Sequence, residues 1–204
     1  KIHGYPRNLL QIGKECRLYH NGSSLPVQFL LSSLCYKIRG KDNSDCSMLR
    51  NLWHHFLLIT RHRHKVIAHC KKAGILWQGL RHDLSKYSPT EFIPGVKYYQ
   101  GNRSPNEKER EILGYSLAWL HHKGRNRHHF EYWTDYNPVE KKVMPVKMPA
   151  RFLVEMFCDR LAASKIYKGE QYTDQAPLEY FQNSSARKNG CLHPETERQL
   201  MQLL

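Results

Sequence analysis

The sequence predicts an all-α protein that folds as a helical bundle, and three observations support this prediction. Of its 204 residues, 40% are apolar and 11% are aromatic, which is enough to bury one hydrophobic core. From about residue 48 onward, apolar residues recur at intervals of three and four positions, as on one face of an α-helix. Proline and glycine stand where such helices would begin and end.

Residues 1–47 differ from the rest of the chain. They contain several glycine, proline and serine residues, end in a polar run at residues 40–47, and show little sustained periodicity. The chain begins with lysine, whereas Met48 immediately precedes a long periodic segment. We therefore expect a less regular N-terminal extension over residues 1–47, which need not belong to the core, and one helical domain over residues 48–204.

Two helices are predicted to follow the extension and to form a hairpin. The first covers residues 49–73 and is ended by Gly74, and the second covers residues 75–87. Because so few residues connect them, we expect the two helices to be antiparallel. Three histidines recur every seven residues along one edge of the first helix's apolar stripe, which should face the second helix. They are His55, His62 and His69.

The next two helices are predicted from capping boxes. In each, a serine caps the helix, a proline takes the first helical position, and a glutamate follows three residues after the cap. The two sequences are Ser88-Pro89-Thr90-Glu91 and Ser104-Pro105-Asn106-Glu107. They predict helices over residues 89–100 and 105–123, which are ended by Gly101 and Gly124.

The rest of the chain is predicted to contain a loop and two further helices. An aromatic and basic loop covers residues 124–148, and helices cover residues 149–168 and 194–204, the last as a packing element. Asp159 occupies a gap in the apolar stripe of the helix at 149–168, so its carboxylate should point inward. Burying an unpaired charge costs on the order of several kcal/mol, so we expect a cation or strong donors beside it. A structural salt bridge or a helix cap is the alternative.

The charge of the chain favours a phosphate-rich partner. It carries 32 Lys and Arg against 18 Asp and Glu, a formal net charge of +14. Such a surface attracts nucleotides, nucleic acid or anionic lipid, although a solvated basic surface would have the same composition. No stretch reaches the roughly 18 apolar residues that a membrane span requires, so no membrane association is expected.

The cysteines indicate a reducing compartment. The six cysteines form no C-x-x-C pair, which argues against a zinc ribbon or a thioredoxin-like motif. Cys70 and Cys158 lie within amphipathic helix patterns, where buried free thiols are common. We therefore expect a cytoplasmic protein.

Candidate metal ligands start with the pair His82-Asp83. Adjacent histidine and aspartate supply a nitrogen and an oxygen ligand, here expected from one helical turn. Ten of the 13 histidines lie between residues 54 and 129, so other ligands are near in the sequence. His62 is preferred because it lies mid-helix, opposite the middle of the partner helix, and His64 and His69 are the alternatives.

Further histidines follow at the end of the predicted helix at 105–123. His121 and His122 are displaced from one another by about 100° around the helix, so both can bind metal only if the helix end covers a two-metal cluster or frays. His128 and His129 follow in the loop, with Lys123, Arg125 and Arg127 between the two pairs. This alternation suits a site for metal and phosphate, although a basic loop for nucleic acid would also produce it.

The order of these residues resembles a known signature. His62, then His82-Asp83, then His121-His122, then Asp159 resembles the signature of the HD-domain metal-dependent phosphohydrolase superfamily. The string from His82 to Lys86 looks like the HD-x-x-K form of its HD-GYP branch. The Gly-Tyr-Pro triplet of that branch is absent after His128-His129, so hydrolysis of cyclic dinucleotides is not implied.

A closer resemblance covers residues 48–204. This segment is similar to an uncharacterised bacterial family of small HD-like proteins, through three strings of residues. They are residues 78–92, residues 98–105 and residues 119–133. The resemblance implies an HD-domain-like helical bundle with a metal site, but it names no substrate.

The resemblance implies a metal-dependent phosphohydrolase that acts on a nucleotide or another phosphate ester through a metal-bound hydroxide. One divalent ion would be held by His62, His82, Asp83 and Asp159. The chain would hold a second ion if His121, His122 or His128 completes a second position, so one or two ions are expected. Mixed nitrogen and oxygen ligands suit Mn, Fe, Co, Ni or Zn. Lys86 would neutralise a phosphoryl oxygen, and Arg125 or Arg127 would take the remaining charge.

Two other functions fit the same residues. A helical nucleic-acid-binding module would use the net charge and the segment 123–136, in which aromatic residues could stack on bases or simply pin the loop to the core. Those aromatic residues are Phe130, Tyr132, Trp133 and Tyr136. A catalytically silent HD-like protein would bind metal and hydrolyse nothing.

Overall fold

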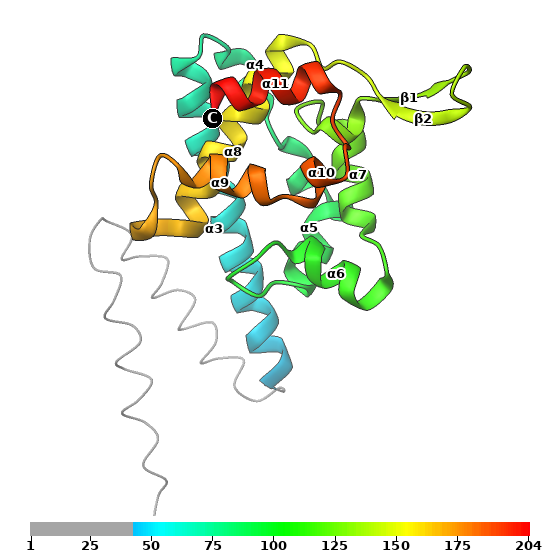
Figure 1. Ribbon diagram of the computed structural model, residues 1–204. Coiled ribbons are helices and arrows are strands. Elements are labelled where there is room, and N and C mark those ends of the chain that lie inside the picture. The colour runs from blue at the N-terminus through cyan, green and yellow to red at the C-terminus, as the bar shows by residue number, and fades with distance from the viewer. Residues whose placement is uncertain (1–42) are drawn as a thin grey trace, which may run out of the picture. The chain divides into compact units, whose positions relative to one another are not determined.

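The computed structural model describes residues 43–204, with side chains from residue 47. Residues 47–204 form one compact unit. In the described part, helices dominate and the only strands form one hairpin, so the all-α prediction is confirmed (Figure 1). The predicted irregularity of residues 1–47 falls almost wholly outside the described residues. None of the described helices is long and apolar enough to cross a membrane.

The first helical hairpin forms, but with different ends. Helix α3 (Asn43–Lys72) begins before the predicted start, and α4 (Leu76–Arg81) returns along it. Gly79 of α4 packs so closely on Cys70 of α3 that a side chain at residue 79 would overlap it. The predicted single helix at 75–87 is wrong, because the chain leaves the α-helix at residue 82 and continues as the 3₁₀ helix η2 (Leu84–Tyr87).

The next part of the chain forms three helices, where the sequence predicted two, over residues 89–100 and 105–123. Helices α5 (Pro89–Lys97), α6 (Pro105–Leu113) and α7 (Leu117–Arg125) replace the two that were expected. Gly114 has a φ of 81° and ends α6, and Ser116 then caps α7 by accepting a 2.9 Å hydrogen bond from the Trp119 backbone N–H. Prolines do begin α5 and α6 as predicted, but neither preceding serine caps its helix through its side chain.

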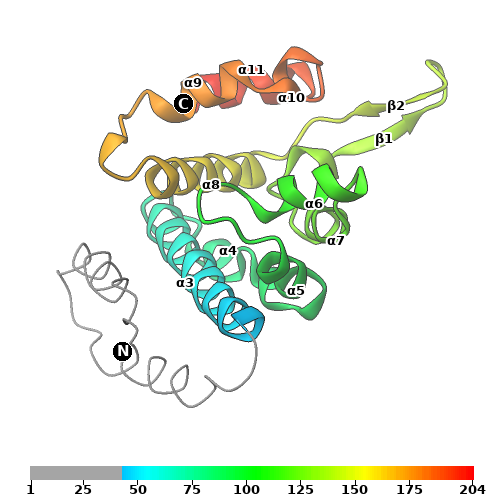
Figure 2. The ribbon, with the colours of Figure 1, turned by 90° about the horizontal axis from the view of Figure 1, so that it is seen from below.

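The second half of the domain contains a projecting hairpin and a helical layer. The predicted loop at 124–148 contains the short helix η3 and an antiparallel hairpin, which projects from the helices in Figures 1 and 2. Helix α8 agrees with the prediction at 149–168, and α11 agrees with the last predicted helix. The elements are η3 (Phe130–Tyr132), β1 (Thr134–Asn137), β2 (Lys142–Pro145), α8 (Ala150–Lys168), η4 (Gly169–Gln171), α9 (Ala176–Asn183), α10 (Ser185–Lys188) and α11 (Pro194–Leu203).

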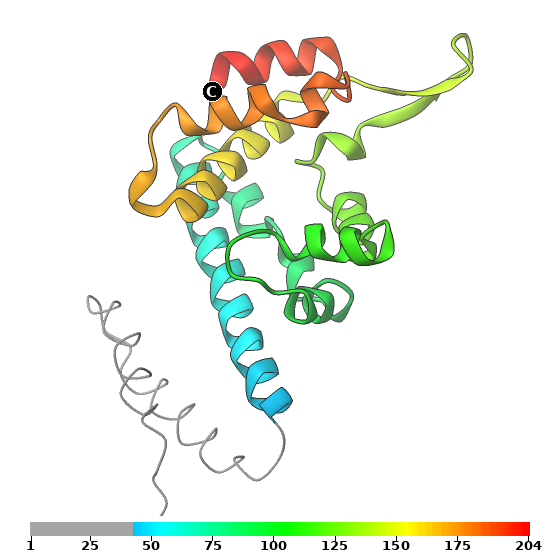
Figure 3. The ribbon, with the colours of Figure 1, turned by 60° about the horizontal axis from the view of Figure 1, so that its bottom comes forward.

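Helix α8 joins the two parts of the hydrophobic core. Figures 2 and 3 show it between α3 on one side and α9 and α11 on the other. Against α3 it buries Cys158 and Ala162 on Val66 and Cys70. Toward α9 and α11 it buries a second cluster made of Met148, Leu153, Met156, Phe181, Leu192 and Leu200. Cys70 and Cys158 are buried free thiols, as predicted.

Candidate metal centre

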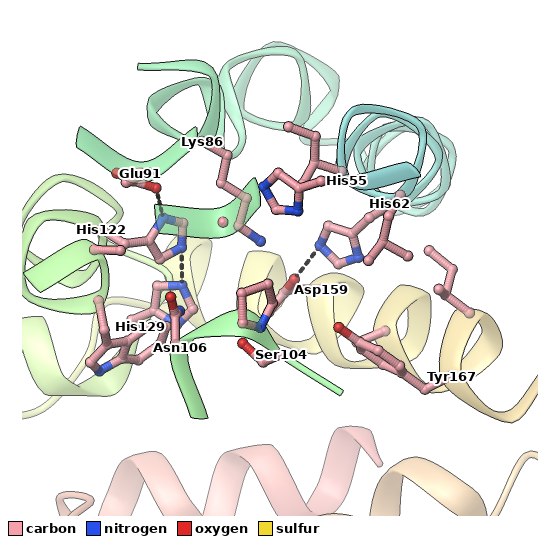
Figure 4. Close-up of a pocket in the computed structure, with 18 residues that line it drawn as sticks. His55, His62, Lys86, Glu91, Ser104, Asn106, His122, His129, Asp159 and Tyr167 are labelled. Carbon is pink, nitrogen blue, oxygen red and sulfur yellow. Dashed lines mark hydrogen bonds and ion pairs between the residues drawn. The ribbon is translucent and has the colours of Figure 1, made fainter. Parts of the chain in front are cut away.

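Seven side chains from four segments converge beside the contact between α3 and α8, and Figure 4 labels His62, His122, His129 and Asp159 among them. The segments are α3, the turn between α4 and η2, α7 with the loop that follows it, and α8. The residues are His62, His82, Asp83, His122, His128, His129 and Asp159. They form two groups that share Asp83, while a third possible group joins His82 and His128 through Glu155. Within each group the candidate ligand atoms lie within 4.8 Å of one another.

The first group consists of His62, His82, Asp83 and Asp159. The Nε2 atom of His62 lies 2.8 Å from Oδ1 of Asp159. The Nε2 atom of His82 lies 3.3 Å from Oδ2 of Asp83 and 3.5 Å from Oδ1 of Asp159. Two imidazole nitrogens therefore face two carboxylates, which is a mixed donor set of the kind that binds first-row transition metals.

The second group consists of Asp83, His122, His128 and His129. The Nε2 atoms of His122 and His129 are 2.9 Å apart. Oδ1 of Asp83 lies 3.3 Å from Nε2 of His122 and 3.5 Å from Nε2 of His128. Asp83 thus presents Oδ1 to this group and Oδ2 to the first, so one carboxylate faces both groups.

The backbone at Asp83 explains how one residue reaches both groups. Helix α4 ends at Arg81, and Asp83 has a φ of 53°, in the left-handed region that aspartate tolerates better than most residues. Arg63 of α3 holds this turn, because its guanidinium donates to the carbonyl oxygens of His82 at 2.8 Å and Leu80 at 2.9 Å. A continuous α-helix through residue 83 would give Asp83 a negative φ, so the turn replaces the helix at this residue.

Glu155, on α8, orients a histidine in each group. Its Oε1 atom lies 2.9 Å from Nδ1 of His82 and 3.2 Å from Nδ1 of His128, and its Oε2 atom accepts from the Gln78 side chain. Both rings consequently direct Nε2 toward Asp83. A carboxylate on the far nitrogen is the usual support of a metal-bound histidine, since it fixes the tautomer and the orientation of the ring.

Glu91, on α5, supports the second group in the same way. Its Oε2 atom lies 2.7 Å from Nδ1 of His122, and its Oε1 atom lies 2.6 Å from Nδ1 of His121. His121 belongs to neither ligand group, so the structure does not place it as the ligand that the sequence suggested. Consecutive helical residues point about 100° apart, and only His122 can face Asp83.

A bound cation would fit the cluster. Five of its buried atoms make no regular hydrogen bond in the described part of the chain: Nε2 of His62, His82 and His128, and both carboxylate oxygens of Asp83. Two of these five have a close ion-pair partner, and one of the two is Nε2 of His62, which faces Oδ1 of Asp159 at 2.8 Å. The ammonium of Lys86 forms an ion pair with Oδ2 of Asp83 at 2.7 Å. Buried polar atoms are rarely left without partners, and the remaining three, Nε2 of His82 and of His128 and Oδ1 of Asp83, mark a place where a cation would satisfy them together. These buried side chains could hold a metal ion.

The carboxylates of the cluster are held in the ionised form that metal binding requires. Burial alone would raise the pKa of Asp83, but the charges of His82 and Lys86 hold it well below its usual range. Burial would also raise the pKa of Asp159, but hydrogen bonds from His62 and His82 lower this pKa well below its usual range. For Glu155, hydrogen bonds from histidines outweigh burial and lower the pKa to about 2.

The sequence profile of DUF5662, a family of unknown function, matches residues 51–204. The chain belongs to this family. No curated protein and no solved structure matches it. The segment shared with DUF5662 contains every residue of both ligand groups and both supporting glutamates.

In this DUF5662 chain, the structure also shows which of the other residues suggested by the sequence reach the cluster or the cavity. His64 is exposed and His69 lies outside both ligand groups, so His62 is the histidine of α3 that reaches the cluster. Arg125 is exposed and does not line the cavity beside the cluster. Sequence reasoning missed Glu91, which it assigned to a capping box, and also Glu155 and the ligand position of His129.

A cavity of about 260 Å³ opens beside the two groups. Its walls come from α3, α5, the start of α6, α7 and α8. Lys86 and Asp159 reach it from the cluster, and His55 reaches it from α3 (Figure 4). A molecule in this cavity would therefore lie against the candidate ligands.

Proposed function

We propose that this DUF5662 protein is a metal-dependent phosphohydrolase of the HD type that acts on a nucleotide or another small phosphate ester. The observation that carries the proposal is the convergence of buried imidazole nitrogens and carboxylate oxygens without hydrogen-bond partners around Asp83. The resemblance of the order His62, His82-Asp83, Asp159 to the HD signature supports the same reaction. The cavity beside the cluster supplies a place for the substrate.

We infer two ions per chain, one in each ligand group, with Asp83 shared between them. The nitrogen and oxygen donors suit Mn, Fe, Co, Ni or Zn. When bound, such ions supply Lewis acidity toward a phosphoryl oxygen and a nucleophile from water near neutral pH. Glu155 and Glu91 keep the Nε2 atoms of His82, His128 and His122 directed at the shared carboxylate.

Lys86 would bind the phosphoryl group. Among the described residues that line the cavity it is the only lysine or arginine, and its ammonium points into the cavity in Figure 4. Its place beside Asp83 puts a positive charge next to the candidate ligands, where it would neutralise a phosphoryl oxygen. Arg125, which the sequence also suggested for this role, is exposed and does not line the cavity.

A nucleic-acid-binding function has less support. The segment 123–136 was its best candidate surface, but Phe130 and Trp133 pack against the core around α8. The guanidinium of Arg127 lies over the rings of Tyr132 and Phe152, at 5.5 and 5.9 Å from their centroids. These side chains are engaged within the fold, so fewer of them are available to stack on bases.

The test combines elemental analysis with hydrolysis assays. The full chain, purified without chelators, is analysed for metal and assayed on nucleotides and simpler phosphate monoesters. We expect bound transition metal, and hydrolysis that a chelator abolishes and that one of the five metals restores. Metal without turnover on any ester would favour the silent HD-like protein. Nucleic-acid binding with a steep salt dependence and no response to chelators would favour the basic module.

A further inference from the structure

The cavity limits the size of the molecule it can accept. Its volume of about 260 Å³ lies just below the range of roughly 300–1,000 Å³ that is typical of drug-sized ligands. One part of this volume is bordered by the candidate ligands and Lys86, where the phosphoryl group of the proposed substrate would lie. The space that remains suits a compact group, much smaller than a nucleic-acid strand or a dinucleotide.

The cavity offers no charged partner for a second phosphate. Lys86 is the only lysine or arginine among its described lining residues, and it already forms an ion pair with Asp83. Away from the candidate ligands and Glu91, the polar lining includes the uncharged side chains of Ser104 and Asn106 at the start of α6. No hydrogen bond within the described residues uses the side chain of either one, so both can bind a ligand. Uncharged donors and acceptors of this kind match hydroxyl groups.

His55 is a buried polar group of this lining. It is 6% exposed, and its Nδ1 atom is buried without a hydrogen-bond partner among the described residues. Burial, with a smaller effect from the charge of Lys86, lowers the pKa of His55 to about 4, so the ring is neutral at pH 7. A neutral imidazole has one donor and one acceptor nitrogen, and leaving one of them unsatisfied is costly.

Neighbouring residues hold the His55 ring in place. Gly95 of α5 lies under the ring edge, and a Cβ atom there would overlap Nε2 of His55. The rings of Phe92 and Tyr99 lie 5.4 and 6.2 Å from it, centroid to centroid. Figure 4 shows His55 on the opposite side of the cavity from Ser104 and Asn106. The imidazole is therefore a fixed group at the cavity wall rather than a mobile surface histidine.

We propose that His55 is a substrate-binding residue that selects monophosphates of small hydroxylated alcohols, of the size of a sugar or polyol. It would hydrogen-bond a hydroxyl group of the alcohol, with Ser104 and Asn106 contacting the opposite side. The inference rests on the proposed phosphohydrolase function, because the metal centre and Lys86 must take the phosphoryl group. It goes further in naming the part of the substrate that decides specificity.

A binding experiment tests the inference without requiring turnover. The histidine side-chain NMR signal that disappears in His55→Phe identifies His55 in the full chain as purified. Ribose 5-phosphate should shift that signal with saturation, inorganic phosphate should leave it nearly unchanged, and ribose 1,5-bisphosphate should bind more weakly than the monophosphate. An unmoved His55 signal at saturating ribose 5-phosphate, or tighter binding of the bisphosphate, would overturn the inference even if the protein is a phosphohydrolase.

Kinetics supply the second readout. His55→Phe should raise KM for ribose 5-phosphate about ten-fold, the value of one hydrogen bond, with little change in kcat or metal content. His55→Gln, which keeps a donor and an acceptor, should recover part of the affinity and serves as the variant of choice if the phenylalanine disturbs folding. His54→Phe is the matched control, because this neighbouring histidine is exposed on another face of α3. An equal KM in His54→Phe and His55→Phe would contradict the proposal.

Discussion

The two ligand groups share Asp83 but are held in place by different kinds of contact. His62 and Asp159 of the first group sit on α3 and α8, beside the apolar contact of Val66 and Cys70 with Cys158 and Ala162. The second group takes its histidines from α7 and the loop after it, which polar contacts hold. Asn126 there donates to the Ser85 hydroxyl at 2.8 Å and to the His122 carbonyl at 2.8 Å.

This difference has a chemical counterpart. The first group contains two carboxylates and two histidines, and the second contains one carboxylate and three histidines. Carboxylates bring charge and favour harder ions, whereas imidazoles suit Zn, Ni or Fe. We expect the first position to be the more rigid and the second to lose its ion first during dialysis, because local opening is easier where apolar packing is sparse.

The largest effect is expected from removing the shared ligand. Asp83→Ala should abolish binding at both positions and lower hydrolysis by more than the roughly 10–100-fold that follows loss of a supporting residue. Metal content by elemental analysis and kcat/KM on a monophosphate measure the effect. Asp83→Asn is the companion variant, since asparagine also tolerates the left-handed φ of 53°. Helicity should persist in both, and retention of metal and activity would eliminate the enzyme proposal.

Single-group variants should separate the two positions. Asp159→Ala removes a ligand only from the first group, and His129→Ala removes one only from the second. Each should lose roughly half of the bound metal, because the other group keeps its complete ligand set. Elemental analysis of the two variants beside His64→Ala, an exposed histidine of α3, decides the matter. Loss of all metal from both variants would show that the groups bind as one site.

The sequence predicts the ligands better than it predicts what supports them. Helix ends follow from local signals, which is why α8 and α11 lie close to their predicted bounds. His82 and Asp83 could be found as an adjacent pair of potential ligands, and His62 from its mid-helix position at the edge of an apolar stripe. Asp159 could be found because a carboxylate interrupts an apolar stripe. Glu91 and Glu155 could not. A glutamate in the first turn of a helix, such as Glu91, is more often part of a cap, and only tertiary packing brings either glutamate to histidine rings.

The errors in the predicted elements have a similar cause. The break at residues 82–83 depends on Arg63 of α3, which is distant in the sequence and binds the carbonyl groups that the turn releases. The hairpin β1–β2 is mostly exposed on both faces, so it lacks the alternation of apolar and polar residues that identifies a strand. Information that resides in long-range contacts or in solvent exposure is absent from local patterns.

The supporting glutamates allow a finer test of the comparison. Glu155→Gln affects a histidine in each group, whereas Glu91→Gln affects only His122 among the ligands. Loss of such a carboxylate typically weakens metal binding by about 10–100-fold. We expect Glu155→Gln to weaken both positions and Glu91→Gln to weaken only the second, as measured by competition with a metal-binding dye. Equal effects of the two changes on both positions would contradict the division into groups.

The smallest effect is expected at Arg63, which shapes the turn without touching a metal. Arg63→Ala removes hydrogen bonds to the carbonyls of Leu80 and His82, and water can replace the exposed one. The free energy of unfolding should fall by about 1–2 kcal/mol, the range for hydrogen bonds from a charged donor that is partly exposed. Urea unfolding of chelated protein measures this without a contribution from metal binding. Arg61→Ala, an exposed arginine of the same helix, should change it little. If the two variants unfold alike, the turn that presents Asp83 is held by the shared ligand cluster itself rather than by α3.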